Sequence, residues 1–98
     1  MRQEIIIHWM DALIEEWYRM RTLRTLSGNC GDEFCTCLGF YYEMHFHLNS
    51  SGYDRTRMKE LAAAVGEEIN VADFDDKTDE IFFWYKGFKF FALDGKEQ

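Results

Sequence analysis

Three cysteines and two histidines near the middle of the chain have the residue types for metal chemistry. Cys30, Cys35 and Cys37 come first, and His45 and His47 follow. Thiolates and imidazoles are the ligands that zinc prefers, and a structural zinc site needs four of them. The spacing matches no standard finger or ribbon. A straight strand rises about 3.3 Å per residue, which would hold Cys35 and His47 about 40 Å apart. We therefore expect no bound metal, and keep a metal-binding module of Cys30, Cys35, Cys37 and His47 as an alternative.

Catalytic chemistry has little support in the same segment. Glu43, His45 and His47 alternate along one strand face and could hold a non-haem metal only if they converged. Cys37 and His45 could form a nucleophile and base pair only if the strand folded back. The chain has no phosphate loop, nucleophile elbow or dinucleotide-binding glycine pattern. We predict a protein that is not an enzyme and uses no cofactor.

A second group of functional candidates is the acidic stretch 67–80. It holds seven of the acids of a chain whose formal net charge is −7, and Lys77 is its one base. This sign argues against direct nucleic-acid binding. Carboxylates on a strand and turn can instead imitate a nucleic-acid backbone and occupy the basic groove of another protein. The candidates for that role are Asp73, Asp75, Asp76 and Asp79. The alternative is a solvated loop that keeps the protein soluble.

The most unusual segment is 81–93, in which seven of thirteen residues are aromatic. A Lys86-Gly87 pair divides it, and this predicts a β-hairpin with strands 80–85 and 88–93. A two-residue turn fixes the cross-strand pairs. One face is wholly apolar and carries Tyr85 with Phe88, Phe83 with Phe90, and Ile81 with Ala92. The other is mixed and carries Trp84 with Lys89, and Phe82 with Phe91.

The mixed face is the candidate binding surface, because a second aromatic face usually needs a partner. Aromatic anchors surrounded by polar groups dominate interface energetics. The candidate residues are Phe82, Trp84, Lys89 and Phe91, with Tyr41, His45 and His47 added from the preceding long strand. The alternatives are ordinary core packing under loops and association with a second copy across a two-fold axis.

Hydrophobic periodicity places these residues on an α+β framework. Apolar side chains at three- and four-residue steps predict helices over 3–24 and 54–65, the second capped by Asp54 or Ser51 and stopped by Gly66. Alternation predicts one long strand over 36–48, or two short ones bent at Gly39, and a further strand over 70–74. The element order is α-β-α-β-β-β. We expect one domain over 1–98, with 94–98 as a loose tail.

Short turns make neighbouring strands antiparallel. We therefore expect an antiparallel sheet of about four strands, with both helices packed on one face. The sequence shows no secretory signal and no apolar run long enough for a membrane span. Three cysteines cannot complete an internal disulfide framework. We expect a cytoplasmic protein with reduced thiols and no membrane contact.

These observations together favour a small acidic interaction module whose partner is another protein. In size, acidity and lack of catalytic motifs the chain is similar to the small inhibitors that phages and mobile elements encode against host nucleic-acid-processing machinery, including anti-CRISPR proteins. The similarity is one of bulk properties and covers no motif. A homodimeric structural domain and a Cys/His metal-binding module are the alternatives.

Overall fold

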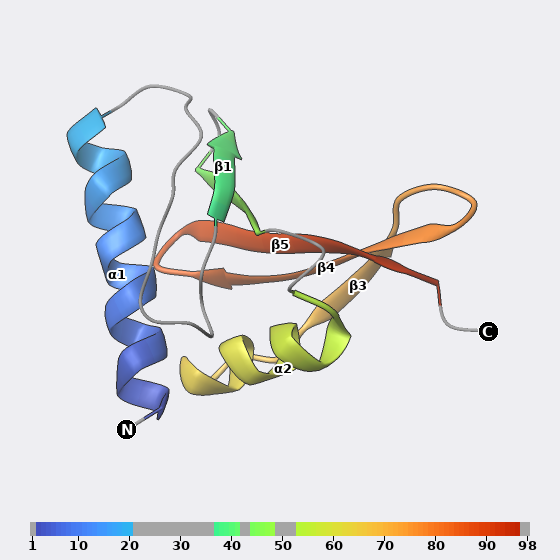
Figure 1. Cartoon of the computed structure of the whole chain (residues 1–98), viewed down its shortest axis with the longest axis horizontal. Coiled ribbons are helices and arrows are strands. Elements are labelled where there is room, and N and C mark those ends of the chain that lie inside the picture. The colour runs from blue at the N-terminus through green and yellow to red at the C-terminus, as the bar shows by residue number, and fades with distance from the viewer. Residues whose placement is uncertain (1, 21–36, 42–43, 49–52, 97–98) are drawn as a thin grey trace.

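The computed structural model of the chain contains two helices and one five-stranded sheet (Figure 1). It describes residues 2–20, 37–41, 44–48 and 53–96. The elements in chain order are α1 (Arg2–Met20), β1 (Cys37–Tyr41), β2 (His45–Leu48), α2 (Arg55–Ala64), β3 (Asn70–Asp73), β4 (Thr78–Tyr85) and β5 (Phe88–Gly95). The strands lie side by side in the order β1-β2-β5-β4-β3. The predicted α+β class is confirmed.

The β4–β5 hairpin runs through the centre of this sheet. Its turn residues, Lys86 and Gly87, have φ values of 53° and 83°. Two successive positive φ angles define the hairpin turn whose twist matches that of the flanking strands. The turn sets the predicted register, in which Tyr85 pairs with Phe88 and Trp84 with Lys89. The turn and the two faces of the hairpin are therefore as the sequence predicts. Its strands are each two residues longer than predicted, and β5 includes Asp94 and Gly95, which the sequence assigned to a loose tail.

The expectation of a purely antiparallel sheet is wrong, because β2 and β5 pair in parallel. The short-turn rule governs only strands that a turn connects, such as β4 and β5. Between β2 and β5 lie α2 and two further strands, so no turn dictates their relative direction. The long strand predicted over 36–48 is two antiparallel strands, with Tyr41 opposite His45. The chain reverses between these two residues rather than at Gly39.

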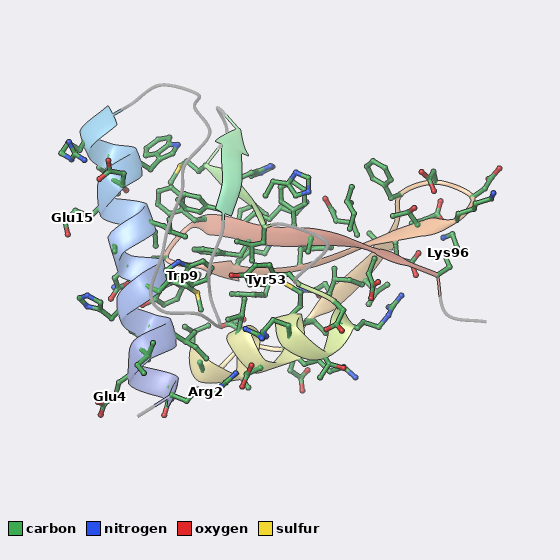
Figure 2. The ribbon with its side chains drawn as sticks, in the orientation of Figure 1. Arg2, Glu4, Trp9, Glu15, Tyr53 and Lys96 are labelled. Carbon is green, nitrogen blue, oxygen red and sulfur yellow. The ribbon has the colours of Figure 1, made fainter. Side chains whose placement is uncertain are left out.

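Helix α1 buries one apolar stripe and exposes the opposite side. The buried side chains recur at three- and four-residue steps: Ile6, Trp9, Met10, Leu13 and Ile14. Figure 2 shows Trp9 directed toward the sheet, where its ring stacks on Tyr53 at 6.1 Å, while Glu4 and Glu15 point away. The stripe follows from the helical repeat of 3.6 residues. The predicted continuation of this helix over 21–24 lies outside the described residues.

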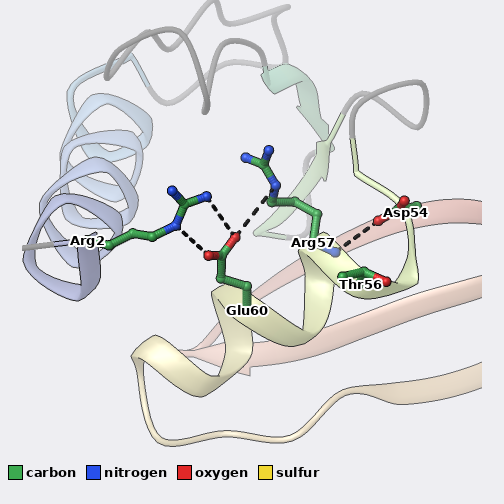
Figure 3. A pocket seen from close by; sticks show the side chains of 5 residues that line it. All are labelled: Arg2, Asp54, Thr56, Arg57 and Glu60. Carbon is green, nitrogen blue, oxygen red and sulfur yellow. Dashed lines mark hydrogen bonds and ion pairs between the residues drawn. The ribbon is translucent and has the colours of Figure 1, made fainter.

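Of the two N-caps predicted for helix α2, Asp54 has that role, and the helix ends before Gly66 as predicted. The Asp54 carboxylate accepts a hydrogen bond from the backbone N–H of Arg57 at 2.9 Å, which is the N-cap interaction. Gly66 follows the helix with a φ of +77°, a conformation that glycine adopts without strain. Glu60 on this helix binds the guanidinium of Arg2 and lies 3.6 Å from Arg57, so it ties α2 to the first turn of α1 (Figure 3).

The core lies between these elements as a single cluster of buried apolar side chains. Its sheet contribution, here called the inner face, consists of Phe46, Leu48, Ile81, Phe83, Phe88, Phe90 and Ala92. The Phe46 ring stacks on Phe88 and Phe90 with centroid distances of 5.3 and 4.9 Å. Trp17 of α1 meets Phe88 edge-on at 5.2 Å. That both helices lie over one face of the sheet stays a prediction.

Candidate functional site

The opposite side of the sheet carries a second cluster of rings, here called the outer face. Its members come from β2, β4 and β5 and are His45, His47, Phe82, Trp84, Lys89 and Phe91. Strand register arranges them in two rows, because paired residues project to the same side of a sheet. The first row is His45, Lys89 and Trp84, and the second is His47, Phe91 and Phe82.

Phe91 lies at the centre of the outer face and is only 7% exposed. The imidazole of His47 stacks on it at 4.6 Å with an interplanar angle of 8°. His45 meets the same ring edge-on at 6.3 Å, and also meets Trp84 edge-on at 5.9 Å. Phe91 was predicted to contact a partner directly. Its burial instead makes it the support on which the two histidines pack.

Lys89 crosses the outer face above the phenylalanine rings. Its ammonium lies 4.5 Å from the centroid of Phe82 and 5.5 Å from that of Phe91, within the range of cation–π attraction. The same ammonium donates a hydrogen bond to the Glu80 carboxylate at 2.9 Å. Lys89 and Glu80 are both partly buried. The Glu80 carboxylate thus compensates the positive charge of Lys89, and these contacts fix the position of the lysine side chain.

Trp84 is the exposed member of the outer face, with 46% of its surface accessible. Phe82, in the adjacent row, is partly buried beneath Lys89. The predicted docking residues therefore separate into two kinds. Trp84 presents an accessible indole, whereas Phe82 and Phe91 form the packed base beside it. Tyr41 is the register partner of His45, on the strand next to this cluster.

The position of His47 also affects its protonation. Burial lowers its pKa below the ordinary value, and the nearby Glu80 carboxylate opposes that shift only in part. A lowered pKa means that the neutral imidazole is favoured in the folded protein. The stack on Phe91 is then a contact between two uncharged rings at neutral pH.

The acidic candidates fall into two groups. Asp79 binds two cations, accepting from the Arg55 guanidinium at 3.1 Å and from the Lys96 ammonium at 2.7 Å. The Lys96 hydrogen bond, followed by that of Arg55, lowers the pKa of Asp79. Lys96, labelled in Figure 2, also binds the carboxylate of Asp73. Two of the four predicted acidic residues are therefore compensated by the bases Lys96 and Arg55 of this chain. The backbone N–H of Arg55 also donates a hydrogen bond to the Asp94 carboxylate at 3.1 Å.

The other two acidic candidates form the turn between β3 and β4. The Asp75 carboxylate accepts a hydrogen bond from the backbone N–H of Lys77 at 2.9 Å, and this bond lowers its pKa. Asp76 is exposed beside it. Asp75 thus has a structural role in shaping the turn, and its charge also remains at the surface.

The alternative metal site is only partly within the described residues. Cys30 and Cys35 lie outside them. Cys37 is the register partner of Leu48, whereas His47 is paired with Gly39. His47 itself is stacked on Phe91. Within residues 2–20, 37–41, 44–48 and 53–96, no three His, Cys, Asp or Glu residues are grouped to hold a metal ion.

Sequence reasoning missed three contributors to these surfaces. Glu80 has the same alternation as Phe82 and Trp84, and this signal could have placed it on the outer face. Val71 and Phe74 are the other two, at 51% and 56% exposure on and just after the edge strand β3. Their exposure could not have been predicted from alternation, since it depends on β3 being the last strand of the sheet.

Comparison of the chain with protein-family models, with curated proteins and with solved structures finds no match. In the part of the chain that the structure describes, no helix combines the length and apolar character needed to cross a membrane.

Proposed function

We propose that this chain is a non-enzymatic interaction module that binds another protein through its outer face, with Trp84 as the anchor. The observation that carries the proposal is an indole 46% exposed beside a cluster of stacked rings. Tryptophan is among the residue types that dominate binding energy at interfaces, and here the exposed indole lies next to packed rings. His45 and Lys89 are the polar groups around it.

The geometry favours an apolar or aromatic pocket on the partner rather than a charged one. Lys89 is already neutralised by Glu80 at 2.9 Å, so an acidic partner would gain little from it. The rings of the outer face are held by mutual stacking before any partner arrives. Such preorganisation reduces the entropy lost on binding. Binding through Trp84 is therefore expected to tolerate salt, since buried apolar contacts are not screened.

The second candidate mechanism is charge mimicry directed at a nucleic-acid-binding protein. Its support is the net charge of −7 together with the exposed carboxylates of Asp75 and Asp76. Lys96 and Arg55 compensate Asp73 and Asp79, which leaves the acidic surface smaller than the sequence suggests. We propose that these carboxylates speed encounter with a basic partner, as in inhibitors of nucleic-acid-processing proteins, while Trp84 supplies the lasting contact.

The test compares matched variants of the whole chain as bait. Trp84→Ala removes the anchor, and Ile5→Ala removes an equally exposed apolar side chain (47%) from α1. Each protein is immobilised and incubated with extract from cells that contain its targets, at low and high salt. We expect a partner that wild type and Ile5→Ala retain at both salt concentrations and that Trp84→Ala loses.

Other outcomes separate the alternatives. Retention by Trp84→Ala, with loss at high salt and in an Asp75→Asn/Asp76→Asn variant, would replace docking by charge mimicry. Light scattering of the purified protein tests the homodimer. A dimer that Trp84→Ala dissociates would show that the outer face binds a second copy instead of another protein.

A further inference from the structure

The open edge of the sheet at β3 is a second place where a partner could bind, separate from the outer face. Among the described strands, β3 pairs only with β4 and ends the sheet (Figure 1). The backbone N–H of Phe74 donates to the Thr78 carbonyl of the β3–β4 turn at 3.1 Å. Hydrogen-bonding direction alternates along a strand, so Ala72 also faces β4, while the N–H and C=O groups of Val71 and Asp73 face outward.

Exposed apolar side chains accompany this edge. Val71 is 51% exposed and Phe74 is 56% exposed. Odd and even residues of a strand project to opposite faces, so the two side chains lie on either side of the edge. An added strand would therefore meet backbone groups along its length and an apolar contact on each face. Strand addition combines these two kinds of interaction, with main-chain hydrogen bonds for affinity and side-chain contacts for specificity.

Charge indicates which kind of strand fits. Exposed Glu67 and Glu68 precede β3, and exposed Asp75 and Asp76 follow it. A partner segment paired along β3 would have carboxylates of this chain near each of its two ends. Basic residues at the ends of that segment would therefore be attracted, and acidic residues would be repelled. A second copy fits poorly. Antiparallel pairing of two β3 strands would set Glu67 and Glu68 of one copy opposite Asp75 and Asp76 of the other.

We infer that the β3 edge, through the outward backbone groups of Val71 and Asp73, binds an extended, basic segment of a partner protein as an added strand. The inference does not depend on Trp84. It concerns the last strand of the sheet, whereas the outer face is built from β2, β4 and β5. The two surfaces can be tested separately, and the failure of one leaves the other standing.

The test uses a capped, fluorescent probe peptide of alternating threonine and valine with two lysines at each end. A twin with glutamates in place of the lysines is the charge control. Val71→Pro removes an outward N–H without breaking a bond to β4, and proline is tolerated on edge strands. We expect the lysine peptide to bind wild type and Trp84→Ala alike, and to bind Val71→Pro at least about tenfold more weakly, the loss of one good contact.

Amide hydrogen exchange on the wild-type protein gives a second readout that needs no variant. The lysine peptide should slow exchange at Val71 and Asp73 and leave the amides of Phe83 and Phe90 unchanged. Equal binding by Val71→Pro, equal binding of the glutamate twin, or no binding up to about 1 mM peptide would overturn the inference. So would a dimer in sedimentation that Val71→Pro dissociates, because a second copy would then occupy the edge.

Discussion

The His47 imidazole lies parallel to the Phe91 ring, with 4.6 Å between centroids and 8° between planes. This contact joins β2 to β5 on the outer face, as the Phe46–Phe90 stack at 4.9 Å joins them on the inner face. Aromatic stacking thus supports the parallel pairing of β2 and β5 on both faces of the sheet. The same contact decides which part of the outer face remains accessible, since it covers Phe91 and leaves Trp84 at the margin.

The His47 stack makes stability depend on pH. Burial lowers the pKa of His47, whereas the unfolded chain has a histidine pKa near the ordinary 6.5. As the pH falls below that value the unfolded state takes up a proton that the folded state resists, so the free energy of unfolding decreases. Urea midpoints between pH 7 and 5 should fall in wild type and in His8→Gln, an exposed control. His47→Phe keeps an aromatic ring at this position and should remove most of the fall in urea midpoint with pH. A fall as large as that of wild type would contradict a role for the buried His47.

Truncating side chains on the two faces of β4 should cost very different amounts of stability. Phe83 is fully buried on the inner face, and Phe83→Ala is expected to cost about 3–5 kcal/mol of unfolding free energy. Trp84→Ala, one residue along, removes a side chain that is 46% exposed and should cost about 1 kcal/mol or less. Chemical denaturation measures both. A loss above about 3 kcal/mol in Trp84→Ala would mean that the indole is structural, and its value as a binding test would be gone.

The turn, register and faces of the central hairpin could be predicted because their determinants are local. Lys86-Gly87 selects a two-residue turn, and alternation then assigns Phe83 and Trp84 to opposite faces. For the same reason the sequence limited the cap of α2 to two candidates, of which the structure has Asp54. The parallel contact of β2 with β5 depends instead on packing between segments far apart in the chain. No sequence period reports such a contact, so the covering of Phe91 by His47 could not be foreseen.

In the candidate site, too, local features could be predicted and contacts between distant segments could not. Trp84 and Lys89 were placed correctly beside each other, because they form a cross-strand pair next to the turn. The sequence predicts the same role for Asp73, Asp75, Asp76 and Asp79, yet Asp79 lies against Arg55, 24 residues earlier. That ion pair arises from docking of α2 near the end of the hairpin. Sequence could show the charge density of this stretch but could not show which carboxylates the fold would neutralise.

The hairpin turn provides a prediction about backbone conformation. Gly87 has a φ of +83°, and a Cβ at this position would lie 3.9 Å from the Met44 Cε, an ordinary contact. The cost of Gly87→Ala is therefore conformational, about 1–2 kcal/mol for an L-residue in the left-handed region. Asparagine tolerates that region better, so Gly87→Asn should lose clearly less. Denaturation midpoints compare the two. Equal losses would point to side-chain crowding rather than to backbone strain.

The carboxylate of Asp79 should stabilise the fold more than any charge at the tip of the β3–β4 turn. Hydrogen bonds from Lys96 and Arg55 lower its pKa, so its contribution is complete above the ordinary 3.8 and disappears as the pH falls below it. Asp79→Asn should lower the melting temperature at pH 7, because two cations lose their shared partner. Asp76→Asn makes the same change of charge at an exposed site and should leave the melting temperature nearly unaltered. As the pH falls below about 4, the difference in melting temperature between wild type and Asp79→Asn should narrow. A gap that does not narrow with falling pH would show that the substitution acts through packing. An equal loss in Asp76→Asn would show that it acts through net charge and not through these ion pairs.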